Sequence, residues 1–234
     1  AETTFYTSAI STSLLLPGKN VLAVEVHQGA LNSSDFSFDL RLYEAQPAIT
    51  RGPYVQMTGS DRATVRWRTD VATTSRLDYG LSTAALNSSA TSATLKTEHE
   101  IALTGLPPDT RFYYAAGNSS ALLASGSTYY FTTHPPVGTI RPYRFWVLGD
   151  PGDANQTAVR NAFYTWNGAQ ELAGVLVLGD TVYETGTDLE FQTKFFDMYP
   201  ATMRNTTTWP TFGNHDAGSA SSATQSGPYY NSFT

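Results

Sequence analysis

Three short polar clusters in the second half of the chain carry the side chains best suited to chemistry. They lie at residues 149–153, 179–183 and 213–216, and each begins with a glycine that lets the backbone turn sharply. Together they offer carboxylates, a phenol, an amide and an imidazole. Hard oxygen donors of this kind favour divalent or trivalent cations, and one carboxylate can bridge two ions. Two such ions roughly 3.5–4 Å apart can activate water and hold a phosphoryl group.

Each cluster follows an apolar segment that predicts a β-strand. Residues 144–148 and 174–178 are continuous apolar runs, as in strands buried on both faces, and residues 208–212 predict a third short strand. Apolar residues at helical spacing predict helices between them, over 158–166 and 189–198. This alternation is the beginning of an α/β sheet. Because the carboxyl edge of such a sheet binds ligands, the three clusters should converge there.

Residues 47–134 predict a complete small β-sandwich. Short alternating segments are separated by turn residues, and the alternation places Val65 and Trp67 on one face. The segment 106–114 resembles the turn and F strand of fibronectin type III domains. Phe112 stands where that family has its corner tyrosine, so the hydroxyl hydrogen bond of the corner cannot form.

Residues 1–46 predict strands of an incomplete β-sandwich. An apolar run at 21–26 follows a turn, and residues 36–42 alternate with period two. The stretch 16–27 resembles the closing strands of jelly-roll, galactose-binding-like domains, with His27 expected on a strand surface. Too few strands are present to bury a core, so we expect poor packing of this segment by itself. The abrupt ends of the chain suggest a piece of a longer polypeptide.

The composition restricts the classes of function. The 234 residues carry a net charge of −6 with a pI near 5.1, which argues against nucleic-acid partners and anionic membrane surfaces. No apolar run is long enough to span a membrane, and the absence of cysteine excludes disulfides, zinc–thiolate sites and a cysteine nucleophile. The 33 Thr, 21 Ser and few Lys suggest an exported protein. Five sequons add weaker support: Asn32, Asn87, Asn118, Asn155 and Asn205.

Taken in order, the three clusters resemble the first three blocks of calcineurin-like metallophosphoesterases. They read Asp150-x-Gly152, then Gly-Asp-x-x-Tyr ending at Tyr183, then Gly-Asn-His-Asp ending at Asp216. Tyr183, and Gly152 where many relatives carry a histidine ligand, are similar to the purple acid phosphatase branch, which commonly carries a fibronectin-like domain upstream. The resemblance implies a multidomain β plus α/β chain: partial jelly-roll strands over 1–46, a fibronectin type III-like sandwich over 47–134, a linker over 135–142, and the first half of a metallophosphoesterase α/β sandwich over 143–234.

The resemblance implies a dinuclear metal centre of Fe(III) and a divalent ion, which is Zn, Fe or Mn. Asp150 and Tyr183 would ligate the ferric ion, Asp180 would bridge both metals, and Asn214 would ligate the divalent ion. Considered singly, Asp150 and Asp180 could also be helix caps or loop acids, Tyr183 could simply pack, and Asn214 could be a turn residue.

The remaining residues of the third cluster would act on a phosphate monoester substrate. His215 would contact the phosphate and help to protonate the leaving group. Asp216 is expected to orient His215 by a hydrogen bond, although it could also only solvate the loop. Asp153 has no counterpart with a role in the family.

Three later histidine ligands that the family site requires are absent from this chain. After His215 no histidine follows, and four of seven expected ligands are present. His99 and His134 are expected to be exposed at strand or linker edges, so they cannot substitute. The chain is therefore expected to be an incomplete and inactive part of a phosphatase. A metallophosphodiesterase and a β-module binding or adhesion protein with a degenerate catalytic domain are the alternatives. The specific substrate and the oligomeric state are left open.

Overall fold

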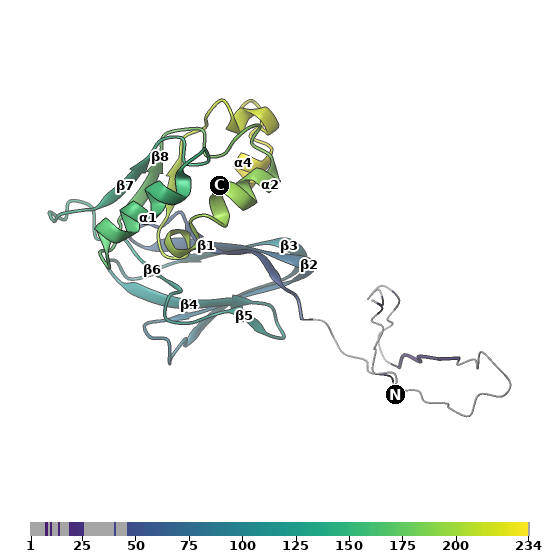
Figure 1. Ribbon diagram of the computed structural model, residues 1–234. Coiled ribbons are helices and arrows are strands. Elements are labelled where there is room, and N and C mark those ends of the chain that lie inside the picture. Colours follow the sequence, from purple (N-terminus) through teal and green to yellow (C-terminus); the bar gives the residue numbers. More distant parts are fainter. Residues whose placement is uncertain are drawn as a thin grey trace. The chain divides into compact units, whose positions relative to one another are not determined.

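The computed structural model describes residues 46–233, together with Ser8, Ile10, Leu14, residues 19–25 and Leu40. The chain divides into two units, Ala1–Ala45 and Gln46–Thr234 (Figure 1). Residues 21–25 belong to no strand and Val21 is 81% exposed, so the strand expected over 21–26 is not formed in its described part. The other strands predicted over 1–46, and His27, lie outside the described residues.

Antiparallel strands of the Gln46–Thr234 unit form one curled sheet that closes on itself as a sandwich (Figure 1). The hydrogen-bonded path runs β1-β2-β4-β5, with β3 on the free side of β2 and β6 paired to β4. The fibronectin-like sandwich that the sequence predicts is thus present. Its strands are β1 Ile49–Gln56, β2 Arg62–Gly80, β3 Ser88–Thr104, β4 Arg111–Gly117, β5 Leu122–Ala124 and β6 Tyr130–Thr132.

Strand β2 is longer than the sequence predicts. Where the sequence predicts short alternating segments separated by turns, residues 62–80 are one continuous strand, whose first part pairs with β1 and whose last part pairs with β4. The register with β3 shifts between Arg68 and Ser75, at irregularities where a strand can bend. This bend lets one strand contribute to both walls of the sandwich.

Val65 and Trp67, predicted to share one face, both lie in the sandwich core together with Phe112, and His99 is buried there as well. His99 is 1% exposed, so the expectation that it is exposed is wrong. It lies opposite Trp67 in the β2–β3 register and stacks on its ring, with centroids 4.9 Å apart. Its Nε2 and Nδ1 contact the hydroxyls of Thr69 and Ser75 at 2.8 and 2.9 Å.

Burial changes the acidity of both described histidines of the sandwich region. Desolvation, with a smaller contribution from the Lys96 charge, lowers the pKa of His99 to about 4. His134 is half-buried rather than exposed, and burial lowers its pKa as well. Both imidazoles are therefore neutral at pH 7.

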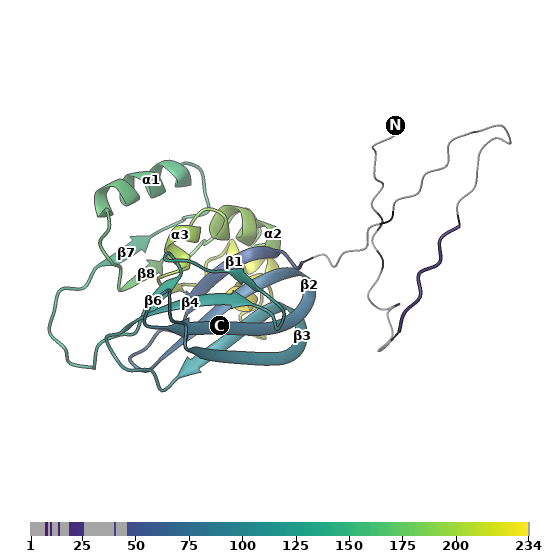
Figure 2. The ribbon, with the colours of Figure 1, turned by 90° about the horizontal axis from the view of Figure 1, so that it is seen from below.

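The second half of the unit is an α/β arrangement built on a parallel sheet of order β7-β8-β9. Aromatic residues of α1 stack on the sheet, with Trp146 and Phe163 3.8 Å apart, and Figure 2 shows α1 on one side of β7 and β8. The predicted alternation of strands and helices is confirmed. The elements are β7 Phe145–Leu148, α1 Gln156–Asn167, β8 Gly174–Val177, α2 Asp188–Glu190, the π-helix η2 Phe191–Phe196, α3 Pro200–Met203, β9 Thr208–Pro210, the 3₁₀ helix η3 Asp216–Ser219 and α4 Pro228–Ser232.

Only one face of the parallel sheet is covered by other described residues. Trp146 and Val177 point into the core with the aromatic residues of η2. On the opposite face Phe145 and Val147 are about half exposed, and Trp209 is partly exposed. The expectation that the first strand is buried on both faces is therefore wrong for the described chain.

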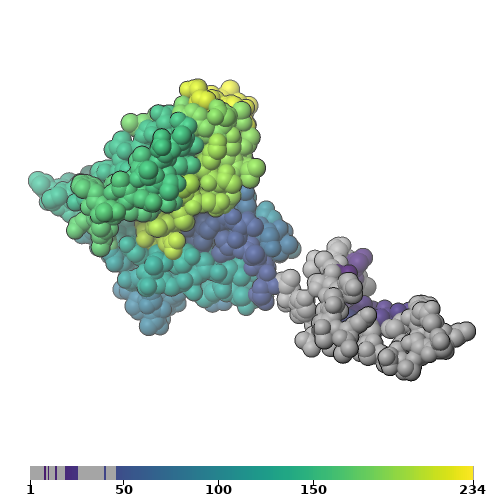
Figure 3. All heavy atoms as spheres, viewed as in Figure 1, coloured from purple at the N-terminus to yellow at the C-terminus, as the bar shows by residue number. Residues whose placement is uncertain are grey.

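The sandwich and the α/β part pack directly against each other (Figure 3). The guanidinium of Arg51 is buried and pairs with Asp188 at 3.0 Å, and Arg68 forms two further bonds to the same carboxylate at 2.6 and 2.7 Å. Tyr54 and Gln56 of β1 donate to the carbonyl of Ser232 in α4. The sandwich thus holds α2 and α4 of the α/β part.

Candidate metal centre

The three polar clusters follow the carboxyl ends of β7, β8 and β9, which end at the same edge because the strands are parallel. The turns out of β7 and β8 require left-handed backbone at Asp150, with φ of 49°, and at Asp180, with φ of 47°. A Cβ on Gly213 would overlap the backbone and carboxylate of Asp180, and a Cβ on Gly152 would overlap the backbone of Val182. Glycine at these positions lets the three loops approach closely.

Tyr183 lies between the two carboxylates predicted to be metal ligands. Its hydroxyl donates to Oδ1 of Asp150 at 2.6 Å and to Oδ2 of Asp180 at 3.4 Å. The hydrogen bond to Asp150, with burial and the negative charges nearby, raises the pKa of Tyr183. Carboxylates from two loops are thus both within hydrogen-bond reach of the Tyr183 hydroxyl.

His215 is held close to these residues by its backbone and its ring. Its N–H donates to Oδ1 of Asp180 at 2.8 Å, and its ring centroid is 4.2 Å from that of Tyr183. Nδ1 lies 2.7 Å from the carbonyl oxygen of Glu184, and because a carbonyl only accepts, Nδ1 carries the hydrogen. That hydrogen bond, then the charges of Asp180 and Asp150, raise the pKa of His215.

Asp216 does not contact the imidazole that it was expected to orient. Its fully buried Oδ2 accepts from the N–H and hydroxyl of Thr181 and from the N–H of Gly213, at 3.1–3.3 Å. Its Oδ1 has no hydrogen-bond partner among the described residues. Burial raises the pKa of this carboxyl, although the N–H groups oppose the shift. Asp216 therefore ties the second cluster to the third, and the orienting contact comes from Glu184 instead.

Asn214 and Asp153 are exposed at the same edge. In the described part of the chain no hydrogen bond or ion pair joins the Asn214 amide to the other predicted ligands. The Asp153 N–H lies 3.4 Å from the Asp150 carbonyl, and its charge contributes to the raised pKa of Tyr183. The site thus has one closely grouped half, at Tyr183, and one open half, at Asn214.

The donor set fits one hard cation better than two. A cation that replaced the phenolic proton of Tyr183 would meet the oxygens of Asp150 and Asp180 as well. The Tyr183 phenol is an essential member of this set, because residues 46–233 and the few described residues before them contain no group of three His, Asp or Glu side chains that could hold a metal.

Two residues outside the clusters hold the loop that carries Tyr183. The Glu190 carboxylate accepts from the N–H groups of Glu184, Thr185 and Thr187, and Lys194 donates its ammonium to the Tyr183 carbonyl. Burial tends to raise the pKa of Glu190, but these N–H groups outweigh it and lower the pKa to about 2. The Thr-x-x-Glu spacing of a capping box, Thr187 to Glu190, is the sequence signal that could have found it.

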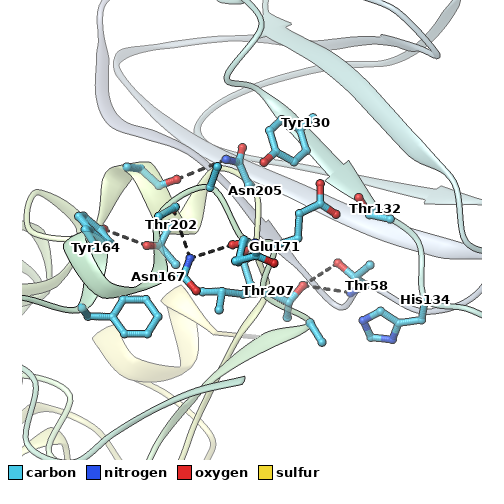
Figure 4. A pocket seen from close by; sticks show the side chains of 18 residues that line it. Thr58, Tyr130, Thr132, His134, Tyr164, Asn167, Glu171, Thr202, Asn205 and Thr207 are labelled. Atoms are coloured by element: carbon cyan, nitrogen blue, oxygen red, sulfur yellow. Dashed lines mark hydrogen bonds between the residues drawn. The ribbon is translucent and has the colours of Figure 1, made fainter. Parts of the chain in front are cut away.

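A cavity lies elsewhere, where the end of α1 and the segment before β9 meet β6 (Figure 4). It has a volume of about 270 Å³, and its lining includes Tyr164, Asn167, Glu171 and Asn205. None of the predicted site residues lines it. The metal chemistry expected from the sequence is therefore not located in this cavity.

Comparison with known proteins gives a family for the sandwich. Residues 50–133 match the family model of the purple acid phosphatase N-terminal domain. This part of the chain is a purple acid phosphatase-like N-terminal domain. A search of curated proteins found no match.

Two solved structures share the fold of the purple acid phosphatase-like domain together with the segment that follows it. The structure of PhoD has a TM-score of 0.54 at 16% identity, over 77% of this chain and 42% of that chain. Purple acid phosphatase PPD1 from seeds of yellow lupin (Lupinus luteus) has a TM-score of 0.53 at 14% identity, over 72% of this chain and 38% of its own. The chain thus spans less than half the length of either structure. Among the described residues, no helix is long and apolar enough to cross a membrane.

Proposed function

We propose that this chain is part of an exported metal-dependent phosphatase that hydrolyses phosphate monoesters. The observation that carries the proposal is the Tyr183 hydroxyl between Asp150 and Asp180, in a chain with a purple acid phosphatase-like domain. Asp150 and Tyr183 would hold Fe(III), Asp180 would bridge the two ions, and Asn214 would hold the divalent Zn, Fe or Mn ion. When bound, the two ions would supply an activated hydroxide and positive charge for the phosphoryl group.

The protein's own residues would manage the proton of the leaving group. The Glu184 carbonyl fixes Nδ1–H of His215 and so leaves Nε2 as the ring atom that can exchange a proton with substrate. In the imidazolium form Nε2–H would donate to the leaving oxygen as the phosphorus–oxygen bond breaks. The raised pKa of His215 favours this protonated form in mild acid.

The 234-residue chain should be a poor phosphatase by itself. The grouped half of the site keeps three oxygen ligands, whereas the open half keeps only Asp180 and Asn214. We expect at most one bound metal ion per chain and no turnover of an aryl phosphate. Two tightly bound ions, with hydrolysis abolished by Asp180→Ala, would contradict this expectation and would mean that further residues or a partner complete the site.

The decisive experiment loads the full-length parent protein with iron and records its visible spectrum. A tyrosinate–ferric bond gives a charge-transfer band, and Tyr183→Phe should remove it. Tyr143→Phe, at an exposed tyrosine before β7, is the matched control and should keep the band. A parent without such a band, in which Tyr183→Phe changes nothing, would overturn the purple acid phosphatase proposal in favour of a metallophosphodiesterase.

A binding or adhesion protein with a degenerate catalytic domain is the second candidate. It is favoured by the lack, among the described residues, of any three His, Asp or Glu side chains that could hold a metal. Sequencing beyond Thr234 in the parent discriminates between the two. Histidine blocks downstream would support the phosphatase, and their absence would support the binding protein.

A further inference from the structure

We propose that Glu190 is a positioning residue of the candidate site, which sets the tautomer of His215 through the 183–187 loop. Glu190 lies in α2, outside the three polar clusters, and touches neither Asp150 nor Asp180 by any hydrogen bond among the described residues. The catalytic meaning of the inference rests on the proposed phosphatase function, but the geometry behind it does not.

The Glu190 carboxylate accepts more hydrogen bonds than a helix cap requires. A capping box uses one backbone N–H at the N-cap, here that of Thr187, which lies 2.9 Å from Oε2. Glu190 also accepts from the N–H of Thr185 at 3.2 Å and from the N–H of Glu184 through Oε1. Hydrogen bonds to an ionised acceptor are stronger than those between neutral groups, so this carboxylate restrains the whole loop.

Glu190 and Lys194 hold the two polar ends of one peptide group. Lys194, one turn further along the helical segment, donates to the carbonyl of Tyr183, and Glu190 accepts from the N–H of Glu184. The Tyr183 C=O and the Glu184 N–H belong to the same peptide. Both polar groups of this peptide are thus paired to charged side chains.

The Glu184 carbonyl belongs to the next peptide, whose N–H, that of Thr185, also donates to the Glu190 carboxylate at 3.2 Å. The Tyr183 phenol donates to Oδ1 of Asp150 at 2.6 Å, and the Glu184 carbonyl meets Nδ1 of His215 at 2.7 Å. Because that carbonyl can only accept, it selects the Nδ1–H tautomer of the neutral ring. If the loop rotated, Nδ1 would lose its acceptor and the ring would return to a mixture of tautomers.

The test is nitrogen NMR of the metal-free 234-residue chain with ¹⁵N-labelled histidine, in which His215→Gln identifies the His215 signals. The starting chain should show Nδ1–H for neutral His215. Glu190→Ala should shift the tautomer ratio about fivefold to tenfold towards Nε2–H, as expected for losing one hydrogen bond. Glu190→Gln, which keeps one acceptor oxygen, should have a smaller effect.

Two control variants separate positioning from capping and from charge. Thr187→Ala removes the cap hydroxyl, which accepts from Glu190 N–H and donates to Oε2, but it leaves the N–H groups of Glu184 and Thr185 on the carboxylate, so it should keep Nδ1–H. Glu171→Gln makes the same charge change far from the site and should also keep it. Unchanged His99 signals report that the sandwich remains folded.

The inference is overturned if His215 keeps its tautomer in folded Glu190→Ala, or if Thr187→Ala shifts the tautomer equally. If Glu190→Ala does not fold, an unchanged tautomer in Glu190→Gln together with Lys194→Met overturns it. Because no metal or substrate is present, these outcomes are independent of the iron spectrum that tests the phosphatase. A parent without the charge-transfer band would leave Glu190 as a positioning residue of a different site.

Discussion

Protonation of the buried His99 should destabilise the β-sandwich in acid. The imidazole stacks on Trp67 inside the core, and burial lowers its pKa from 6.5 to about 4. The unfolded chain therefore binds a proton at a higher pH than the folded chain does. The stability that neutral His99 contributes is fully present above pH 6.5 and is lost as the pH falls through about 4.

The size of the loss follows from the shift in pKa. Each pH unit between the two pKa values is worth about 1.4 kcal/mol, so complete protonation should lower the free energy of unfolding by about 3 kcal/mol. That is a large part of the total for a small domain, which is typically about 5–15 kcal/mol. Mild acid should consequently bring the sandwich close to its unfolding transition.

Urea unfolding of the chain and of His99→Gln, measured between pH 4 and 7, tests this reasoning. Glutamine can still bond to Thr69 or Ser75 but does not titrate, so the variant is expected to be less stable at pH 7 and to lose less stability in acid. The difference in free energy of unfolding between the two proteins should shrink as the pH falls. Parallel pH profiles, or an NMR titration of folded His99 with a pKa near 6.5, would refute it.

Three further predictions concern packing. Asp188→Asn should lower the free energy of unfolding by about 2 kcal/mol, because it weakens the pairing of the buried Arg51. The control is Asp109→Asn, at a residue that pairs with the exposed Arg141, and it should change this free energy by less than about 1 kcal/mol. Urea unfolding measures both. Gly213→Ala should lower the thermal midpoint of unfolding and move the third cluster away from Asp180. Gly52→Ala, which has open space around its Cβ, should leave the midpoint unchanged. An unchanged midpoint for Gly213→Ala would contradict the close approach of the two loops. Phe145→Ser on the uncovered sheet face should reduce self-association in light scattering with little change in thermal midpoint, and equal association of both proteins would show that this face does not drive it.

Local patterns were enough to predict elements whose residues alternate or repeat at a fixed spacing. The three parallel strands, both helices between them and the sandwich core around Trp67 follow directly from such patterns. The length of β2 does not, because residues 70–75 break the alternation of apolar and polar residues on either side of them. They continue the strand only because β3 pairs with β2 on both sides of the irregularity.

Errors at single residues come from tertiary contacts that a local pattern cannot contain. His99 lies in an alternating strand, where period two leaves the choice of face open until the partner strand is known, and the register opposite Trp67 decides it. The error at Phe145 has the opposite cause. An apolar run shows that a strand can be buried on both faces, but it does not show whether other described residues cover both faces.

The candidate site shows which contacts a sequence motif can predict and which it cannot. The positions of the clusters after predicted strands were enough to predict that Asp150, Asp180 and Tyr183 lie at one sheet edge. In the structure the Tyr183 hydroxyl is within hydrogen-bond reach of both carboxylates. A motif identifies residues but not the groups that orient them. The sequence therefore assigned the contact with the His215 ring to Asp216, whereas in the structure Asp216 joins two loops and the Glu184 backbone carbonyl meets the ring. That carbonyl has no sequence signature of its own. Its position is set by Glu190 and Lys194, and the capping box that contains Glu190 is the one part of this support that the sequence displays.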